Sequence, residues 1–268
     1  MMRRIVCAGD SFTAGVELCA DELIPNYTQN LLGNLDEIPK DMEDLNNKFV
    51  SKITKMPKQD RLAYWEKERN LAWPSYMKSA KNRVYNVSSG GISNQEICHR
   101  AISKLEEIGR KPKEKLYAFV MLTSPERYGH PTSDTINPYG YPFKQLYSQT
   151  LAKGKGPDYD VTEYWYTHHD SIDLYWHSYN AIHGLINYCR YMRVQLTLFD
   201  SCLWNWGYQN ILKWKKDDPR LSLVQNLRGT IPTTYTMSDF AGPKTKLPGG
   251  HFCLDVHKKF GKAASDLL

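Results

Sequence analysis

Short apolar runs that end at turn residues limit most strongly what this chain can fold into. Four of them cover residues 4–8, 83–88, 116–122 and 194–199, and a weaker fifth run covers 230–237. Runs of this length between turn signals are typical of buried strands. Helical patterns separate them, and strands that alternate with helices predict an α/β fold with a mostly parallel sheet covered on both faces.

The helical patterns are defined by their apolar spacing and by a start signal. Ser93 and Glu96 have the spacing of a capping box, in which the serine accepts from an early helix N–H and the glutamate reaches back. A second helix is expected over about 171–191, and the last helix carries Val256 and Phe260 on its apolar face.

Two long segments break the alternation of strands and helices. Residues 24–72 are polar and charged with helical stretches, which predicts an insertion between the first and second strands. Residues 128–168 are rich in Tyr, Gly and Pro, and we expect a long aromatic loop that borders the ligand crevice and sets substrate choice. Despite these segments, a length of 268 residues suits a single domain over 1–268.

Composition excludes several classes of partner. The formal charge of +6 is spread along the chain without a basic block, so we expect no nucleic-acid partner. There is no run of 18 apolar residues, so no membrane association is expected. The first apolar run is too short for a signal peptide and the 6 cysteines are scattered, which favours a cytoplasmic protein without a metal site. The oligomeric state stays open.

Polar residues follow the predicted strands at the edge where an open parallel sheet binds ligands. Ser11 follows the first strand, Gly91 the second and Ser124 the third, and His251 precedes the last helix. A serine hydroxyl becomes a nucleophile when a base such as histidine takes its proton. The oxyanion that forms needs fixed donors, which the backbone N–H groups of Ser11 and Gly91 and the hydroxyl of Ser124 or Thr123 could supply.

Three segments resemble the sequence blocks of SGNH (GDSL-like) hydrolases. Gly9-Asp10-Ser11-Phe12 resembles the first block, NVSSGGISN the second, and GGHFCLDVHKKFG the last. The stretch AWPSYM…YNVSSGGISNQEI is also similar to SGNH-type proteins of tailed phages. The resemblance implies a flavodoxin-like three-layer fold with Ser11 as nucleophile, His251 as base, Gly91 as an oxyanion donor and no cofactor. It makes His257 a later, non-catalytic histidine.

The chain departs from the family pattern in two places. The family's Gly-x-Asn-Asp block is replaced by TSPER at 123–127, so the oxyanion asparagine is missing. Pro248 stands where the family has an aspartate three residues before the histidine. We therefore expect low turnover, and expect His251 Nδ1 to meet a backbone carbonyl or a carboxylate from another segment, with Asp239 and Asp255 as candidates.

The predicted function is a serine esterase that acts on a small-molecule or carbohydrate ester, with an O-acetyl group on a carbohydrate as one candidate. Two alternatives remain open: a weak or inactive SGNH-fold binding or structural protein, and an O-acyltransferase that uses the same residues. Each site residue also has a purely structural interpretation. Ser11 would be a helix N-cap, Gly91 a tight turn, and His251 a cap of the last helix.

Overall fold

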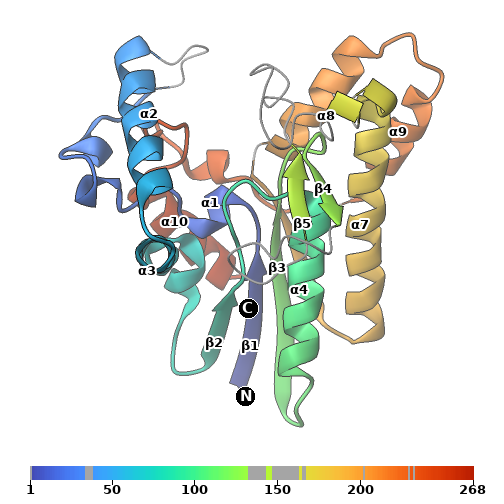
Figure 1. Ribbon diagram of the computed structural model, residues 1–268. Coiled ribbons are helices and arrows are strands. Elements are labelled where there is room, and N and C mark those ends of the chain that lie inside the picture. The colour runs from blue at the N-terminus through green and yellow to red at the C-terminus, as the bar shows by residue number, and fades with distance from the viewer. Residues whose placement is uncertain are drawn as a thin grey trace.

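A four-stranded parallel sheet with the order β2-β1-β3-β6 forms the centre of the fold (Figure 1). The computed structural model describes residues 2–33, 39–131, 143–146, 163–164, 167–201, 203–228, 230–231 and 233–268. The strands of the sheet are β1 (Met2–Ala8), β2 (Asn82–Asn86), β3 (Glu114–Leu122) and β6 (Gln195–Asp200). The α/β class and the four strands expected from the apolar runs are therefore confirmed.

Burial explains why the inner strands are so apolar. Val6 of β1 pairs with Tyr85 on one side and Ala118 on the other, so this strand has neighbours along both edges. Ile5 to Ala8 and most of β3 are also covered on both faces, and strands covered on both faces are apolar throughout rather than alternating.

The prediction of a full fifth strand over residues 230–237 is wrong. Within the described part of this segment, only the stretch around Thr234 pairs with the end of β6. Thr234 N donates to Leu198 O at 2.9 Å, and Asp200 N donates to Tyr235 O at 3.0 Å. This pairing is too short to count as a fifth strand, so among the described residues β6 is the last strand on this side of the sheet.

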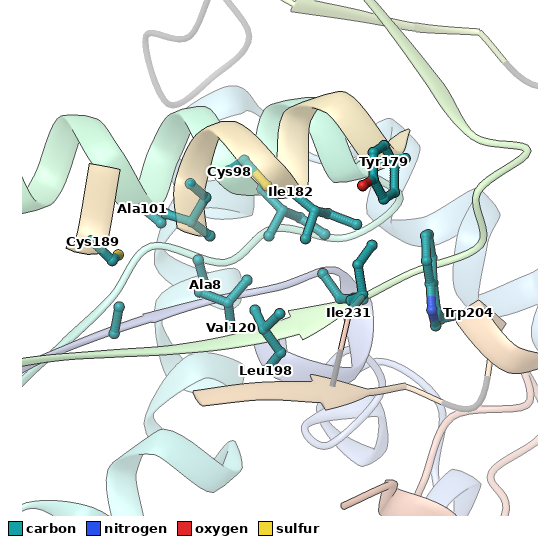
Figure 2. Packing of buried hydrophobic residues seen from close by; sticks show 14 of the residues in the cluster. Ala8, Cys98, Ala101, Val120, Tyr179, Ile182, Cys189, Leu198, Trp204 and Ile231 are labelled. Carbon is teal, nitrogen blue, oxygen red and sulfur yellow. The ribbon is translucent and has the colours of Figure 1, made fainter. Parts of the chain in front are cut away.

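Helices cover both faces of the sheet, and successive strand residues face opposite layers. Val6 and Ala8 face a core built with α4 (Asn94–Ile108) and α7 (Ser171–Tyr191). Figure 2 shows Ala8, Val120 and Leu198 pointing from the strands toward these helices. Ile5 and Cys7 face a second core beneath α10 (Leu254–Ser265), which also contains Phe119 and Phe260.

The remaining helices connect these layers. The α-helices are α1 (Ser11–Ala14), α2 (Lys40–Lys55), α3 (Lys58–Leu71), α8 (Leu203–Trp214) and α9 (Leu221–Arg228). The described part of the chain also contains the short 3₁₀ helices η1 (Ala20–Glu22), η2 (Tyr27–Gln29), η3 (Trp73–Met77) and η4 (Met237–Phe240). Among the helices that the structure describes, none is long and apolar enough to cross a membrane.

The capping box expected at the start of α4 is only half correct. The Ser93 hydroxyl accepts from Glu96 N at 3.3 Å, as predicted. The Glu96 side chain does not reach back, because it forms a buried ion pair with Arg100 one turn later. Arg100 also donates to Val87 O at 3.2 Å, so this pair holds the loop that follows β2.

The described helices and strands of the two unusual segments lie toward the carboxyl end of the sheet (Figure 1). Residues 24–72 contain α2 and α3 between β1 and β2, as expected for a helical insertion (Figure 1). Part of 128–168 is not a loop, because β4 (Tyr128–Pro131) and β5 (Phe143–Leu146) form an antiparallel pair. Residues 132–142, 147–162 and 165–166 of that segment lie outside the described residues. β4 follows β3 directly and contacts α4 and α7.

Candidate active site

Ser11 lies just after the carboxyl end of β1, one of the two inner strands of the sheet, on the first turn of α1. The N-cap of this helix is Asp10, whose side chain accepts from Phe12 N at 3.1 Å. The interpretation of Ser11 as the N-cap is therefore wrong, and the serine is the first helical residue. Its side chain is mostly buried, with 6% of its surface exposed.

Asp10 fixes this turn through contacts with the end of β3. Its Oδ2 accepts from the Thr123 hydroxyl at 2.6 Å and from Arg127 Nη1 at 3.0 Å. The Asp10 side chain is fully buried, while Arg127 is partly exposed. Since the Thr123 hydroxyl donates to Asp10, its only proton is not directed to an oxyanion.

The loop after β2 lies against Ser11. Ser89 N donates to Gly9 O at 3.2 Å, and a Cβ placed on Gly90 would lie 3.9 Å from Ser11 Cβ. Gly91 follows with a φ of +73°, a left-handed conformation that favours glycine. The structure thus brings the second sequence block next to the serine, and the oxyanion role of Gly91 stays a prediction.

Ser124 has a local role in the turn after β3. Its hydroxyl accepts from Glu126 N at 3.4 Å. A Cβ on Gly207 of α8 would lie 3.2 Å from the Ser124 hydroxyl, so the helix packs closely over this side chain. Within the described part of the chain, no hydrogen bond joins Ser124 to Ser11 or His251, and its contribution to an oxyanion site stays a prediction.

His251 comes from the other end of the chain and packs beside the serine helix, but among the described residues no hydrogen bond joins its ring to Ser11. It lies on a tight hairpin in which Leu247 N donates to His251 O at 2.7 Å and Gly250 adopts a φ of +85°. The His251 ring packs against Phe12, the residue after Ser11, with a centroid distance of 5.3 Å. The first and last sequence blocks are therefore neighbours in space, as expected.

Glu17 is the carboxylate that partners His251. Its Oε2 lies 2.7 Å from His251 Nδ1, and the same oxygen accepts from His251 N at 3.3 Å. Its Oε1 accepts from Gly249 N at 2.7 Å and from the Tyr27 hydroxyl. Because an ionised carboxylate only accepts, Nδ1 carries a proton and Nε2 is left with the lone pair of a base.

The environment of Glu17 favours its ionised form. Burial acts to raise the pKa of this carboxyl, since only 1% of its surface is exposed. The charge and hydrogen bond of His251 oppose that effect, and so do the hydrogen bonds from Tyr27 and Gly249. Together these groups hold the pKa of Glu17 below its ordinary value.

A carboxylate from another segment was expected, and this is confirmed, but both named candidates are wrong. Asp239 caps η4 by accepting from Thr236 N at 2.8 Å. Asp255 is exposed and pairs with Lys259 at 2.7 Å. Glu17 was missed because its orientation depends on a left-handed φ of +75°, which no periodic pattern reveals. The only sequence signal was an acidic residue shortly after the serine helix.

Steric contact with Glu17 explains why residue 249, two positions before His251, is a glycine. A Cβ on Gly249 would overlap Glu17 Oε1 and would lie 2.8 Å from Asn46 Oδ1. The carboxylate therefore occupies the space that any larger residue at 249 would need. This close approach explains the first glycine of the GGH sequence.

His257 is a structural residue, as the resemblance implied. It is fully buried, and its Nδ1 accepts from Trp73 N at 3.2 Å. Burial, with a smaller contribution from the charge of His251, lowers the pKa of His257 to about 3. This histidine is therefore neutral at neutral pH and links η3 to α10.

A cation lies at the side of the His251 hairpin. The ammonium of Lys246 is 3.5 Å from the ring centroid of Phe252 and 5.3 Å from that of Phe12. In the part of the chain that the structure describes, no three His, Cys, Asp or Glu side chains are grouped as metal ligands.

Comparison with known proteins gives no further assignment of this site. Neither a protein-family model nor a curated protein matches the sequence of the chain. The functional interpretation therefore depends on the geometry of Ser11, His251 and Glu17.

Proposed function

We propose that this protein is a serine esterase that hydrolyses a small carboxylic ester through Ser11, His251 and Glu17. The observation that carries the proposal is the 2.7 Å contact between His251 Nδ1 and the buried Glu17 carboxylate, on a ring packed against Phe12. A carboxylate at Nδ1 fixes the histidine tautomer and leaves Nε2 to act as base toward a serine. A histidine that only capped the last helix would not need a buried carboxylate partner.

The proposed reaction has two half-reactions. Ser11 Oγ attacks the ester carbonyl carbon while His251 Nε2 takes the hydroxyl proton, and the tetrahedral oxyanion accepts hydrogen bonds from the N–H groups of Ser11 and Gly91. Collapse breaks the bond to the leaving alcohol, which receives the proton from His251. Water then attacks the acyl-Ser11 ester with His251 again as base, releasing the carboxylic acid and the free serine.

The charge of Glu17 supports both steps. His251 becomes a cation in each transition state, and a buried anion beside Nδ1 stabilises that cation more than an exposed one would. Since the pKa of Glu17 is below its ordinary value, this carboxyl is ionised at neutral pH. In this proposal Glu17 takes the role that the family gives to an aspartate at the position of Pro248.

The fold supports the same proposal at a coarser level. A parallel sheet with helices on both faces, and a serine after the central first strand, is compatible with the flavodoxin-like SGNH architecture in a single domain. The substrate class is a small-molecule or carbohydrate ester, with a carbohydrate O-acetyl group as the candidate. No cofactor takes part, and the expected location is the cytoplasm.

One observation favours the second candidate function, a scaffold of weak or no activity. The family's oxyanion asparagine is absent from 123–127, and the Thr123 hydroxyl in that block donates to Asp10. Loss of one oxyanion donor costs about 10² to 10³ in turnover. An O-acyltransferase would use the same Ser11 and His251 with an alcohol in place of water.

The direct test is hydrolysis of p-nitrophenyl acetate by wild type, Ser11→Ala and His251→Ala. We expect both variants to lose the activity above background, and expect the double variant to be no worse than either, because the two residues act as a unit. Product analysis with added alcohols separates hydrolysis from acyl transfer. Equal activity in wild type and Ser11→Ala would favour the binding-protein function.

A further inference from the structure

We infer that Tyr27 is a positioning residue of this site, whose hydroxyl fixes the Glu17 carboxylate against His251. This inference rests on the proposed function and extends it to the helical insertion at residues 24–72. The mechanism described above uses no residue of this insertion, and Tyr27 gives it a role.

The two oxygens of Glu17 have separate partners. Oε2 is directed to the ring and backbone of His251, while Oε1 accepts from the Tyr27 hydroxyl and Gly249 N. With both oxygens engaged on opposite sides, the carboxylate plane cannot rotate without breaking a hydrogen bond. Tyr27 supplies the only one of these contacts that comes from a side chain outside the histidine hairpin.

Tyr27 is itself held rigidly by its surroundings. The residue is fully buried, and its ring packs on Phe49 of α2 at a centroid distance of 5.1 Å. Phe49 in turn packs on Tyr64 of α3 at 6.4 Å. The Tyr27 hydroxyl also lies 3.3 Å from Asn46 Oδ1. Helices α2 and α3 therefore set the position from which the hydroxyl reaches Glu17.

The charges around Glu17 are consistent with this role. Glu68 of α3 is a second buried carboxyl in this cluster, and burial raises its pKa to about 8. At neutral pH Glu68 is therefore uncharged and does not repel the Glu17 anion. Tyr27 and Tyr64 are also neutral, since burial raises the pKa of each hydroxyl well above its ordinary value. His251 is then the basic group that faces this anion, and the Tyr27 hydrogen bond stabilises the same charged form.

The first experiment compares pH profiles of kcat/KM for wild type, Tyr27→Phe and Tyr64→Phe. Tyr27→Phe keeps the ring but removes the donor to ionised Glu17, so Glu17 becomes protonated at a higher pH. We expect the acid limb, which reports the coupled protonation of His251 and Glu17, to leave its wild-type position. We also expect kcat to fall about tenfold with KM unchanged, which matches the loss of one hydrogen bond to a charged group. Tyr64→Phe removes a hydroxyl of the same aromatic cluster that does not bond Glu17, and should keep the wild-type profile. A wild-type profile and kcat in Tyr27→Phe would overturn the inference.

The second experiment does not depend on activity. The imidazole N–H proton that lies between His251 and Glu17 can be followed by proton NMR of the intact protein as the pH is lowered. We expect its resonance to disappear at a higher pH in Tyr27→Phe than in wild type. Replacing Tyr27 with 3-fluorotyrosine keeps the packing and strengthens the donor, so the resonance should persist to a lower pH. If both replacements leave the pH of disappearance unchanged, the inference is wrong. If the two replacements shift the resonance as expected but the wild-type protein hydrolyses no ester, only the proposed function fails.

Discussion

Glu17 Oε2 lies 2.7 Å from His251 Nδ1, so the carboxylate that orients the histidine comes from the turn after the serine helix. Serine and carboxylate therefore belong to one short segment at the end of β1, and the histidine docks onto it from the C-terminal hairpin. A shift of that hairpin would separate His251 from Glu17 and from the Phe12 ring at once. The arrangement makes the contact between the two chain ends the centre of the site.

If the proposed function holds, replacing Glu17 with glutamine should lower kcat by about 10⁴, as loss of the orienting carboxylate does in a well-studied serine protease. The amide keeps the size of the side chain but cannot stabilise the imidazolium, and its NH₂ group favours the wrong histidine tautomer. Ester hydrolysis under saturating substrate measures the effect. Asp255→Asn is the matched control, because Asp255 is exposed and pairs with Lys259. Equal kcat in both variants would remove Glu17 from the mechanism.

Gly249→Ala should reduce both stability and activity. The added methyl group would overlap Glu17 Oε1, so either the hairpin or the carboxylate must move. Overpacking of this kind costs about 1 to 3 kcal/mol in free energy of unfolding. Gly242→Ala is the control, since a Cβ there meets nothing within 4 Å. Urea denaturation and kcat should both change in the first variant, and retention of wild-type kcat would show that Glu17 does not need this close contact.

Asp10→Ala should cost stability, in contrast to Ser11→Ala. The aspartate caps α1 and accepts from Thr123 and Arg127 while fully buried, so its loss leaves these donors without their acceptor. We expect a loss of about 2 kcal/mol or more in free energy of unfolding. Ser11→Ala should leave the thermal midpoint almost unchanged, because its hydroxyl is not the helix cap. Similar midpoints for the two variants would contradict the assigned roles.

His257 should make the protein less stable in mild acid. Its pKa is lowered to about 3 in the fold, while an unfolded histidine titrates near pH 6.5, so the unfolded chain binds more protons between these values. Its contribution is therefore intact above about pH 6.5 and is lost progressively as the pH falls toward 3. Glu68, with a pKa of about 8, has the opposite effect between its unfolded value and pH 8.

A comparison of wild type with His257→Gln isolates the histidine from Glu68. Urea denaturation at pH 7 and pH 5 should show a smaller pH-dependent loss in the variant than in wild type. An equal loss in the two proteins would mean that His257 does not titrate as described.

The sequence predicts the framework of this fold better than the details of its site. The strands could be predicted because β1 and β3 are covered on both faces and must be apolar throughout. The segments that carry Ser11 and His251 could be placed side by side because each lies at a strand end or helix start with a recognisable block. Glu17 could not, since its direction depends on one left-handed residue rather than on a repeated pattern.

The same limit applies to the residues that support Glu17. Tyr27 lies in a segment whose polar composition predicts helices but not the surface onto which they fold. At 230–237 the local pattern predicted too much rather than too little. Its apolar residues predicted a full strand, but only a short stretch around Thr234 pairs with β6. Contacts between distant segments therefore decide the parts that local patterns cannot.

The most direct test of the central claim is labelling with a fluorophosphonate, followed by mass spectrometry of the peptides. The reagent bonds covalently to a serine oxygen only when a neighbouring base activates it. The account predicts a single adduct on Ser11 in wild type, slower labelling in Glu17→Gln and none in Ser11→Ala. An unlabelled wild-type protein, or an adduct on another serine such as Ser124, would contradict the claim that Ser11, His251 and Glu17 form a catalytic site.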